Sequence, residues 1–324
     1  MDLTRRSMLA MGGGLLLGGP GVATAAEWPD RPIRLVIGYP PGGATDGVAR
    51  ALLAPMMKAL GQPVVMDYKP GAGGATAAEQ VGRSAPDGYT LHLIEGSVLT
   101  ALPHLRNLGF DPVRSLRPIG MVATGGVAIV ANPSLGVSSI AELISAAKAN
   151  PGGLTYGTSG AGGAQHLAAE LFQSTARIKL QHIPYKGGAP AMNDLLGGQI
   201  QLLFSSMTPA VPMVKAGKIK ALGVTSRTRS SSLPDVPTVA EQALPGFDAE
   251  VWLAIVAPVG LPDAVVGKLS SAVHAAIADP DVQAQIRSQG YEPTQSSPSE
   301  IANRIRVDSD RWSRIIMDAG ISLD

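Results

Sequence analysis

The chain has 324 residues, with 26 lysines and arginines against 25 aspartates and glutamates. The basic residues are scattered singly, whereas a nucleic-acid partner requires a basic stripe that neutralises phosphates, so we exclude nucleic acid as a partner. The sequence contains no cysteine, which excludes disulfides, thiolate nucleophiles and thiolate metal sites. At roughly 100 to 200 residues per domain, this length predicts two domains or one large one.

Residues 1–26 have the pattern of a cleaved export signal. Arg5 and Arg6 precede an apolar stretch that ends near Val22, and the small residues "ATAA" precede Glu27. Glycines break the apolar stretch, which is shorter than the roughly 20 residues needed to span a bilayer. "TRRSML" resembles the twin-arginine export motif, although the general secretory route also tolerates paired arginines. We expect an exported, periplasmic protein that begins at Ala26 or Glu27.

Along the rest of the chain, short β-rich runs alternate with amphipathic helical runs. This order predicts an α/β fold, in which helices cover sheets that are largely parallel. After Leu261 we expect only helices, because "PDAVVGKLSSAVHAAIADPDVQAQIRSQG" and the segment that follows "SPSE" have helical patterns. The predicted strands are Ile33–Gly38, Val64–Tyr68, Thr90–Ile94, Pro118–Val122, Val127–Ala131, Leu154–Tyr156, Leu180–Ile183, Ile200–Phe204, Ile219–Val224 and Val251–Val256.

Four loops share one plan, in which a strand is followed by small residues and then by a helix. They are "YPPGGATD", "KPGAGGATAAE", "GTSGAGGAQHLAAELF" and "PYKGGAPAMNDLL". In open parallel sheets such loops lie beyond the carboxyl ends of the strands, where ligands usually bind. Glycine allows close approach to the backbone, and the first helical turn offers unpaired amides with a partial positive charge. Tight turns alone explain any single loop, but four together favour an anion site.

Other chemistries have weaker support in the sequence. No loop ends in the Gly-Lys-Ser/Thr of a Walker motif, and no acid follows "GTSGAGGAQH" at the spacing of a dinucleotide site. There is neither a G-x-S-x-G elbow nor an H-E-x-x-H pair, so we predict no catalytic residue, metal or cofactor. His166 could contact a ligand or pack locally, and both interpretations stay open. Asp46 is explained by a favourable charge in a first helical turn.

Nearly all of the mature chain resembles the substrate-binding receptors of tripartite tricarboxylate transporters, also called Bug proteins. The resemblance rests on ordered segments that include "WPDRPIRLVIGYPPGGATDGVAR", "LTYGTSGAGGAQHLAAELF", "IPYKGGAPAMNDLLGGQIQLLF" and "LPDVPTVAEQALPGFDAEVW". It implies a bilobal periplasmic receptor with two α/β lobes, two crossing strands and a ligand cleft. It also implies a small carboxylate ligand, delivery to a membrane permease pair, and a monomer.

The strand order predicts where the lobes divide. The strand "VWLAIVAP" returns after the second group of glycine loops. We therefore expect residues 27–122 and 250–324 to form the first lobe and residues 123–249 the second.

The resemblance also assigns ligand-binding roles to loop positions. In the first lobe these are Tyr39, Pro41, Gly42, Gly43, Ala44, Thr45 and Asp46. In the second lobe they are Thr158, Ser159, Gly160, Ala161, Gly162, Gly163 and His166. Ser97, Tyr185 and Ser205, with their neighbours Gly96, Lys186 and Ser206, would line the rest of the pocket.

Two departures from the family pattern bear on the ligand. Tyr39 stands where many relatives carry phenylalanine, and Ser205 and Ser206 stand where many carry Asp or Asn. Several relatives use that acidic position towards a ligand amine, so the resemblance favours a dicarboxylate or an aromatic acid over an amino acid. A receptor that feeds a signalling partner and a periplasmic hydrolase remain as alternative functions.

Overall fold

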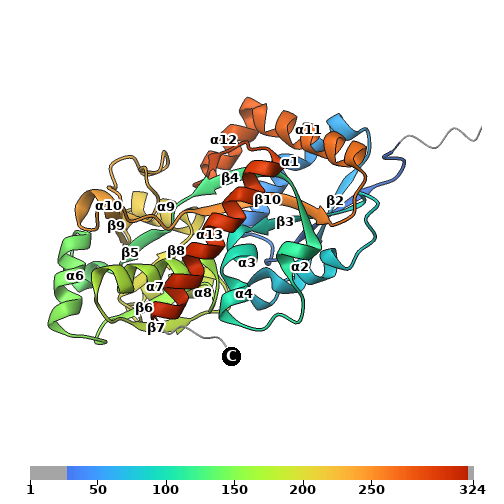
Figure 1. Cartoon of the computed structure of the whole chain (residues 1–324). Coiled ribbons are helices and arrows are strands. Elements are labelled where there is room, and N and C mark those ends of the chain that lie inside the picture. The colour runs from blue at the N-terminus through green and yellow to red at the C-terminus, as the bar shows by residue number, and fades with distance from the viewer. Residues whose placement is uncertain (1–27, 320–324) are drawn as a thin grey trace, which may run out of the picture.

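The computed structural model describes residues 28–319, which form two β-sheets flanked by helices (Figure 1). The predicted export signal at residues 1–26 lies outside the described residues, as do Glu27 and residues 320–324. Within the described range, no helix is both long and apolar enough to cross a membrane. The two helix-covered sheets confirm the predicted α/β class.

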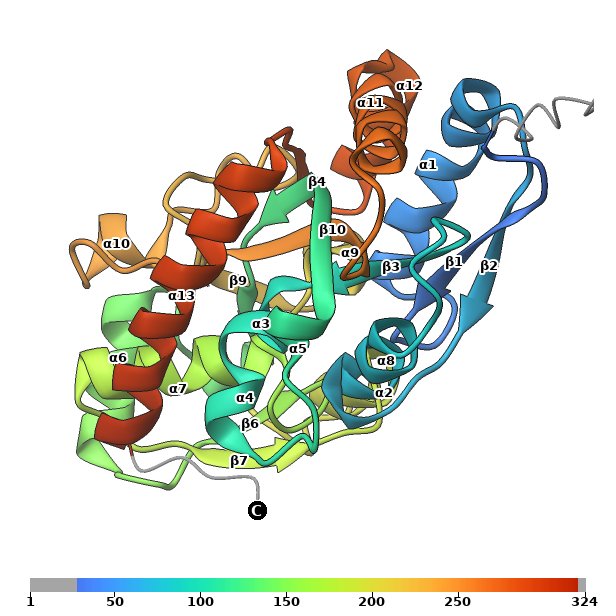
Figure 2. The same cartoon turned by 45° about the vertical axis from the view of Figure 1, so that its right-hand side comes forward.

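The first sheet has the strand order β11-β4-β10-β3-β1-β2. β1 pairs in parallel with β2 and β3, and β10 pairs antiparallel with β3 and β4. Both faces are buried, because α1, α11 and α12 pack on one face and α2, α3 and α13 on the other (Figure 2). The strands are β1 (Ile33–Ile37), β2 (Val64–Tyr68), β3 (Thr90–Glu95), β4 (Leu116–Gly125), β10 (Val251–Pro258) and β11 (Glu292–Pro293). The helices are α1 (Ala44–Leu60), η1 (Ala72–Gly74), α2 (Ala75–Gly82), α3 (Gly96–Thr100), α4 (Leu102–Leu105), α5 (Pro112–Ser115), α11 (Asp263–Ala278), α12 (Pro280–Ser288) and α13 (Pro298–Ala319).

The second sheet has the order β7-β6-β8-β5-β9. β6 pairs in parallel with β7 and β8, while β5 runs antiparallel to β8 and β9. Its apolar residues alternate between a face covered by α6 and α7 and a face covered by α8 and α9. The strands are β5 (Ala128–Ala131), β6 (Thr155–Thr158), β7 (Gln181–Pro184), β8 (Leu202–Ser205) and β9 (Lys220–Val224). The helices are η2 (Pro133–Leu135), α6 (Ile140–Ala149), α7 (Ala164–Ala176), α8 (Gly188–Leu196), α9 (Met207–Lys215) and α10 (Val239–Gln242).

The chain crosses between the sheets twice, and the crossing segments are paired. β4 ends at Gly125 just before β5 begins, and β10 starts at Val251 directly opposite Gly125. These two long strands correspond to the predicted crossing strands of a bilobal fold. The division into lobes at residues 122/123 and 249/250 stays a prediction.

β11 shows that one expectation was wrong. We predicted no strand after Leu261, yet Glu292 and Pro293 pair with Thr124 and Ala123 at the edge of the first sheet. A two-residue strand is too short to have a periodicity, and it is held by its partner strand. Its pairing places the segment after α12 beside the crossing point.

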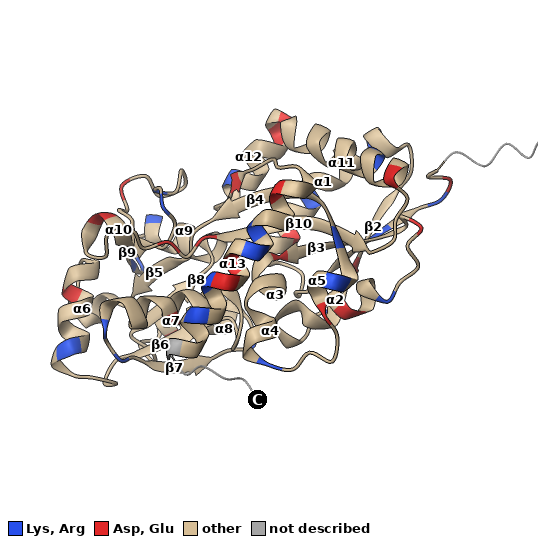
Figure 3. Ribbon diagram, in the orientation of Figure 1, with Lys and Arg blue, Asp and Glu red and all other residues tan. Residues whose placement is uncertain are grey.

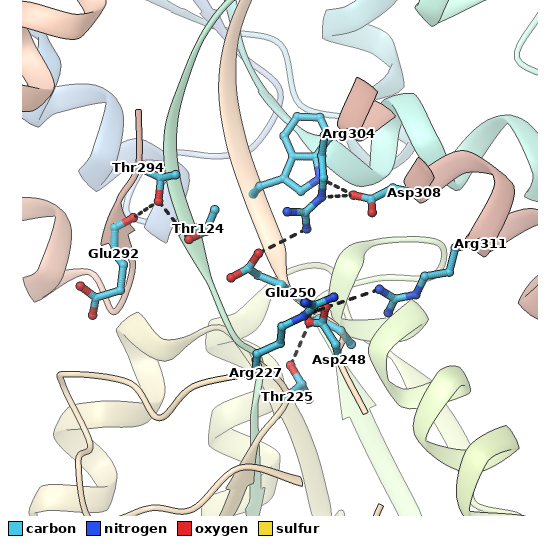
Figure 4. A network of polar contacts seen from close by, with 12 residues as sticks. Thr124, Thr225, Arg227, Asp248, Glu250, Glu292, Thr294, Arg304, Asp308 and Arg311 are labelled. Atoms are coloured by element: carbon cyan, nitrogen blue, oxygen red, sulfur yellow. Dashed lines mark hydrogen bonds and ion pairs between the residues drawn. The ribbon is translucent and has the colours of Figure 1, made fainter. Parts of the chain in front are cut away.

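α13 runs across both halves of the molecule. It packs on β4, α3 and α4 of the first half and also contacts α7 of the second (Figures 1 and 2). Figure 4 shows the polar network beneath it, where the Trp252 indole N–H donates to Asp308 Oδ2 at 2.9 Å. Arg304 donates to Asp308 at 2.7 Å and to Glu250 at 3.2 Å, so this helix is tied to the start of β10. Trp252 therefore packs beside the crossing segment.

Basic and acidic residues are interspersed over the ribbon, and both kinds occur along α13 (Figure 3). Arg227, which follows β9 of the second sheet, and Arg311 on α13 both lie near Asp248, at 2.8 and 3.6 Å (Figure 4). Such mixed charge favours solubility over binding to a polyanion.

Candidate functional site

A pocket of about 680 Å³ lies between loops of the two sheets. One wall comes from the loops that follow β1, β2 and β3, and the other from the loops that lead into α7, α8 and α9. The segment after α12 closes one side with Tyr291. This volume lies in the range of pockets that hold small-molecule ligands, roughly 300 to 1,000 Å³.

Helix starts surround this pocket, and their caps lack the usual side-chain hydrogen bond. The N-cap residues that line it are Gly43 of α1, Gly74 of α2, Glu95 of α3, Gly163 of α7, Gly187 of α8 and Ser206 of α9. Four of the six are glycines, which have no side chain to act as a cap, and neither Glu95 nor Ser206 accepts a hydrogen bond from the helix that it begins. Apart from the Ala75 amide of α2, which donates to the Ala72 carbonyl, no side chain occupies their first-turn amides, and the helix dipoles favour an anion there.

Helices that begin elsewhere are mostly capped. Side chains accept hydrogen bonds from first-turn amides at the starts of α5, η2, α6, α10 and α12, whereas α4 and α11, like the six helices at the pocket, lack such a cap. The predicted capping pair in α6 is present, since Ser139 Oγ accepts from the Glu142 amide at 3.2 Å. Helix starts without a side-chain cap are thus concentrated at the pocket. Uncapped starts would be unfavourable there unless water or a ligand satisfied the amides.

Asp46 shapes the first glycine loop from behind. Its carboxylate accepts from the Gly42 amide at 2.9 Å, from Arg50 Nε at 3.0 Å and from the Tyr68 hydroxyl at 2.5 Å. Burial acts to raise the pKa of Asp46, but these hydrogen bonds outweigh it and the pKa is lowered. Asp46 does not line the pocket. It holds the loop so that the amides of Ala44 and Thr45, at the start of α1, remain open.

His166 holds the facing glycine loop in the way that Asp46 holds the first one. The Gly162 amide donates to His166 Nδ1 at 3.1 Å, which fixes this nitrogen as an acceptor. The ring stacks on His182 with centroids 4.1 Å apart. Burial lowers the pKa of His166, and burial with the neighbouring His166 lowers the pKa of His182 to about 3. Both rings are therefore neutral at ordinary pH.

The two facing loops are built alike. In each, a glycine with positive φ (Gly42 at 87°, Gly162 at 77°) donates its amide to a side chain four residues later. The next glycine is the N-cap, and an alanine follows it. The shared pattern G-G-A-x-(D/H) is visible in the sequence, but the role of its last residue is visible only in the structure.

The structure separates the predicted site residues into two groups. Tyr39, Pro41, Gly42, Gly43, Ala44, Thr45, Ser159, Gly160, Ala161 and Gly163 line the pocket. Asp46, Ser97, Thr158, Gly162, His166, Tyr185 and Ser205 are not among its lining residues. The role of all of them in ligand binding stays a prediction.

Most residues in the second group lie one layer behind the pocket wall. Thr158 Oγ1 is 2.8 Å from His182 Nε2, and the Tyr185 hydroxyl donates to Asp194 at 2.7 Å. The Ser205 hydroxyl donates to the Ser206 carbonyl, so Ser206 rather than Ser205 lines the pocket. Ser97 lines a separate cavity of about 20 Å³ beside Trp252.

The pocket also contains residues that were not predicted as site residues. These include Gly71, Gly73, Gly74, Glu95, Gln165, Gly187, Thr208 and Tyr291. Five of them, Gly71, Gly73, Gly74, Gln165 and Gly187, belong to glycine loops that the sequence already marks as candidate anion sites. Glu95 and Tyr291 had no such signal, since Glu95 ends an ordinary strand and Tyr291 arrives through β11.

Glu95 and two tyrosines form a polar end of the pocket. Glu95 is 5% exposed, and the Tyr39 Oη lies 2.5 Å from its Oε2. Burial raises the pKa of Glu95, although hydrogen bonds from Tyr39 and Ser97 partly offset this. Burial and the nearby Glu95 also raise the pKa values of Tyr39 and Tyr291. Among residues 28–319, no group of three or more His, Asp or Glu side chains is arranged to hold a metal ion.

Comparison with known proteins identifies the family. The sequence model of the tripartite tricarboxylate transporter family receptor matches residues 48–321. The chain belongs to this receptor family. Protein BugT of Bordetella pertussis (strain Tohama I) is 34% identical over 328 residues, which cover 100% of both chains.

Solved structures of similar proteins support the same fold. An R. palustris protein with adipate has 32% identity and a TM-score of 0.85, over 91% of this chain and 99% of that chain. MatC from Rhodopseudomonas palustris with bound malate has 29% identity and a TM-score of 0.82, over 89% and 100%. The structure of the periplasmic binding protein BugD has 35% identity and a TM-score of 0.81, over 91% of this chain and 99% of that chain. The receptor described here therefore has the bilobal fold of periplasmic binding proteins, as the family resemblance implies.

Proposed function

We propose that this protein is a periplasmic receptor that binds a small organic acid and delivers it to a membrane permease of the tripartite tricarboxylate type. One carboxylate is held between the starts of α1 and α7, by the amides that follow Gly43 and Gly163. The observation that carries this proposal is the gathering of uncapped helix starts around one pocket. Amide hydrogen bonds to a carboxylate are charge-assisted, so strong binding needs no arginine.

A site divided between two lobes also permits release. We propose that residues 27–122 and 250–324 move as one lobe and residues 123–249 as the other. When the cleft opens, the two groups of amides separate and the carboxylate loses half of its partners. The malate and adipate in the structures of relatives support carboxylates as the first ligands to test.

A thermal-shift screen of di- and tricarboxylates and aromatic acids tests the function. A true ligand at 100 times its Kd should stabilise the fold by about 2.7 kcal/mol. Calorimetry then gives the Kd, and chromatography of the recovered ligand distinguishes a receptor from a hydrolase. Recovery of a chemically altered acid would establish turnover, and the absence of binding to any carboxylate would refute the proposal.

We further propose export to the periplasm by a cleavable signal. N-terminal sequencing of protein from the periplasm should give Ala26 or Glu27 as the first residue. Replacement of Arg5 and Arg6 by lysine should reduce export if the twin-arginine route is used. Unchanged export of that double variant would indicate the general secretory route.

A further inference from the structure

The end of the pocket at Glu95 is built differently from the amide-lined walls. Glu95 is the last residue of β3 and the N-cap of α3, it is 5% exposed, and it lines the pocket with Tyr39 and Tyr291. The Tyr291 side chain is also buried, at 5% exposure. Among residues 28–319, no group accepts a hydrogen bond from the Tyr291 hydroxyl. The hydroxyl oxygen is not among the buried atoms that lack a partner, so it reaches the pocket, where a ligand or water can accept its hydrogen bond.

The hydrogen bonds of Tyr39 compensate only partly for the burial of Glu95. The Tyr39 Oη lies 2.5 Å from Glu95 Oε2 and 3.0 Å from the Gly73 carbonyl oxygen. The hydroxyl has a single proton, and the carbonyl can only accept. Tyr39 is the donor in both contacts, so this one proton is shared between Gly73 and Glu95. A proton carried by Glu95 itself is not used by Tyr39 and can be donated to a ligand.

The surroundings of Glu95 agree with a neutral carboxyl. The titratable groups that act on it are Tyr39 on the β1 side and Tyr291 beside β11. The Ser97 hydroxyl on α3 hydrogen-bonds to it, and β10 places the apolar Leu253 opposite it in the sheet. The charged Lys186 lines the same pocket from the other sheet, at the start of α8. Burial without a paired cation favours the uncharged form of a carboxyl.

We propose that protonated Glu95 and the Tyr291 hydroxyl form a second subsite, which accepts the second carboxylate of a dicarboxylate ligand. This inference rests on the proposed function, because the first carboxylate is assigned to the amides of α1 and α7. Ionised Glu95 would repel the second carboxylate. The ligand therefore binds only when Glu95 carries a proton. If Glu95 is ionised in the ligand-free protein, binding takes up one proton from solvent.

The test is calorimetry from pH 5.5 to 8.5 with two matched series of ligands. One series is succinate, glutarate and adipate, and the other is the monocarboxylates of equal length, butyrate, valerate and hexanoate. In the parent protein, the Kd of the best dicarboxylate should rise about tenfold per pH unit once Glu95 ionises in the empty pocket. The Kd of the monocarboxylate of the same length should change much less over that range.

Two variants assign the effect to Glu95. Glu95→Gln is permanently neutral and of similar shape, so it should make the Kd of the dicarboxylate nearly independent of pH. Glu79→Gln, on α2 and paired with Arg83 outside the pocket, is the matched control and should keep the pH profile of the parent. Tyr291→Phe should lower the ratio of dicarboxylate to monocarboxylate affinity about fivefold to tenfold, as expected for one hydrogen bond to a charged group.

Proton uptake supplies a measurement on the parent protein alone. Titrations at one pH in phosphate and in Tris, whose ionisation enthalpies differ, should show uptake of up to one proton per dicarboxylate. The inference is overturned if Glu95→Gln keeps the pH profile of the parent, or if the parent takes up no proton at any pH. It is also overturned if amino acids bind best and Glu95→Gln abolishes their binding, because Glu95 would then be an ionised partner for an ammonium group. Failure of every carboxylate to bind at any pH would instead refute the proposed function.

Discussion

At the residue scale, the glycines at the helix starts owe their importance to the space that they leave. A Cβ built on Gly43 would meet only the Pro40 carbonyl, at 3.8 Å, and one on Gly163 would meet nothing nearer than Gln165 Oε1, at 3.7 Å. The fold can therefore accept side chains at both positions. Gly162 differs, because its φ of 77° would strain any other residue.

We expect Gly43→Val and Gly163→Val to weaken carboxylate binding by tenfold or more, equivalent to about 1.4 kcal/mol. A branched side chain would occupy the space that the ligand or its waters need. Thr45→Val should do less, within the roughly 0.5 to 3 kcal/mol expected for one hydrogen bond. Gly267→Val on α11, where a Cβ meets nothing within 4 Å, is the control and should leave the Kd unchanged. Normal folding and unchanged binding of both pocket variants would show that the carboxylate site is misplaced.

A second residue-scale prediction concerns His92 in the centre of β3. It is 1% exposed, its Nδ1 donates to the Val36 carbonyl at 2.9 Å, and its Nε2 has no partner. Burial lowers the pKa of His92 to about 4, although the bond to Val36 acts in the opposite direction. Below pH 6.5 the unfolded chain binds a proton at His92 that the folded chain does not bind. Stability that is present above pH 6.5 is therefore lost as the pH falls towards 4.

His92→Asn keeps a donor for Val36 and removes the titration. Its free energy of unfolding should fall less than that of the parent between pH 7 and pH 4, by up to about 3 kcal/mol at roughly 1.4 kcal/mol per pKa unit. Urea denaturation at several pH values measures this difference. His166 and His182 contribute with the same sign, so the parent slope is a sum of these effects. Equal slopes in parent and variant would contradict the prediction.

At the scale of elements, one buried carboxylate on α13 ties this helix to β10. Asp308 is 7% exposed and accepts from both the Trp252 indole and Arg304 (Figure 4). Removal of this carboxylate leaves the buried indole N–H of Trp252 and the half-buried guanidinium of Arg304 without this hydrogen-bond acceptor. Unpaired buried groups of this kind cost roughly 1 to 3 kcal/mol, and more when they are charged.

We therefore expect Asp308→Ala to lower the free energy of unfolding by about 2 to 4 kcal/mol. Asp308→Asn, which keeps an acceptor for Trp252, should lose less. The matched control is Asp310→Ala on the same helix, because the Arg306–Asp310 pair is exposed, 3.8 Å apart, and worth less than about 1 kcal/mol. Urea denaturation compares the three variants. Similar losses for Asp308→Ala and Asp310→Ala would show that α13 is not anchored in this way.

At the scale of the whole molecule, the segment after α12 meets α9 of the second half. The Thr208 hydroxyl donates to the Gln289 carbonyl at 2.7 Å, and a Cβ on Gly290 would lie 2.0 Å from Met207 Cβ. Thr208 and Tyr291, which flank this contact, both line the pocket. The approach of the two halves therefore requires glycine at position 290.

Gly290→Ala should keep the halves apart and weaken ligand binding by more than tenfold. Its φ of +81° would also strain alanine by roughly 1 to 2 kcal/mol, whether or not the halves meet. Gly246→Ala separates these effects, because φ there is +80° and a Cβ meets nothing within 4 Å. The two variants should lose similar stability without ligand, and only Gly290→Ala should lose affinity. Equal affinities would show that this contact does not govern closure.

The sequence by itself determined the alternation of strands and helices, the α/β class and the glycine loops at strand ends. These features follow from local periodicity and turn chemistry, which are properties of neighbouring residues. The first ten strands begin within two residues of their predicted positions, from Ile33 in β1 to Val251 in β10. The repeated G-G-A-x-(D/H) pattern can also be read from the sequence.

Only the tertiary structure decided which of those residues face the pocket. The family resemblance assigns Asp46 and His166 to the ligand, and in the structure each accepts from a backbone amide of its own loop behind the wall, because a side chain in the first helical turn can reach back to that loop. Glu95 and Tyr291 are nearly 200 positions apart and meet because β11 pairs with β4. Long-range pairing of this kind has no local signal, so the polar end of the pocket could be found only once the strands were in register.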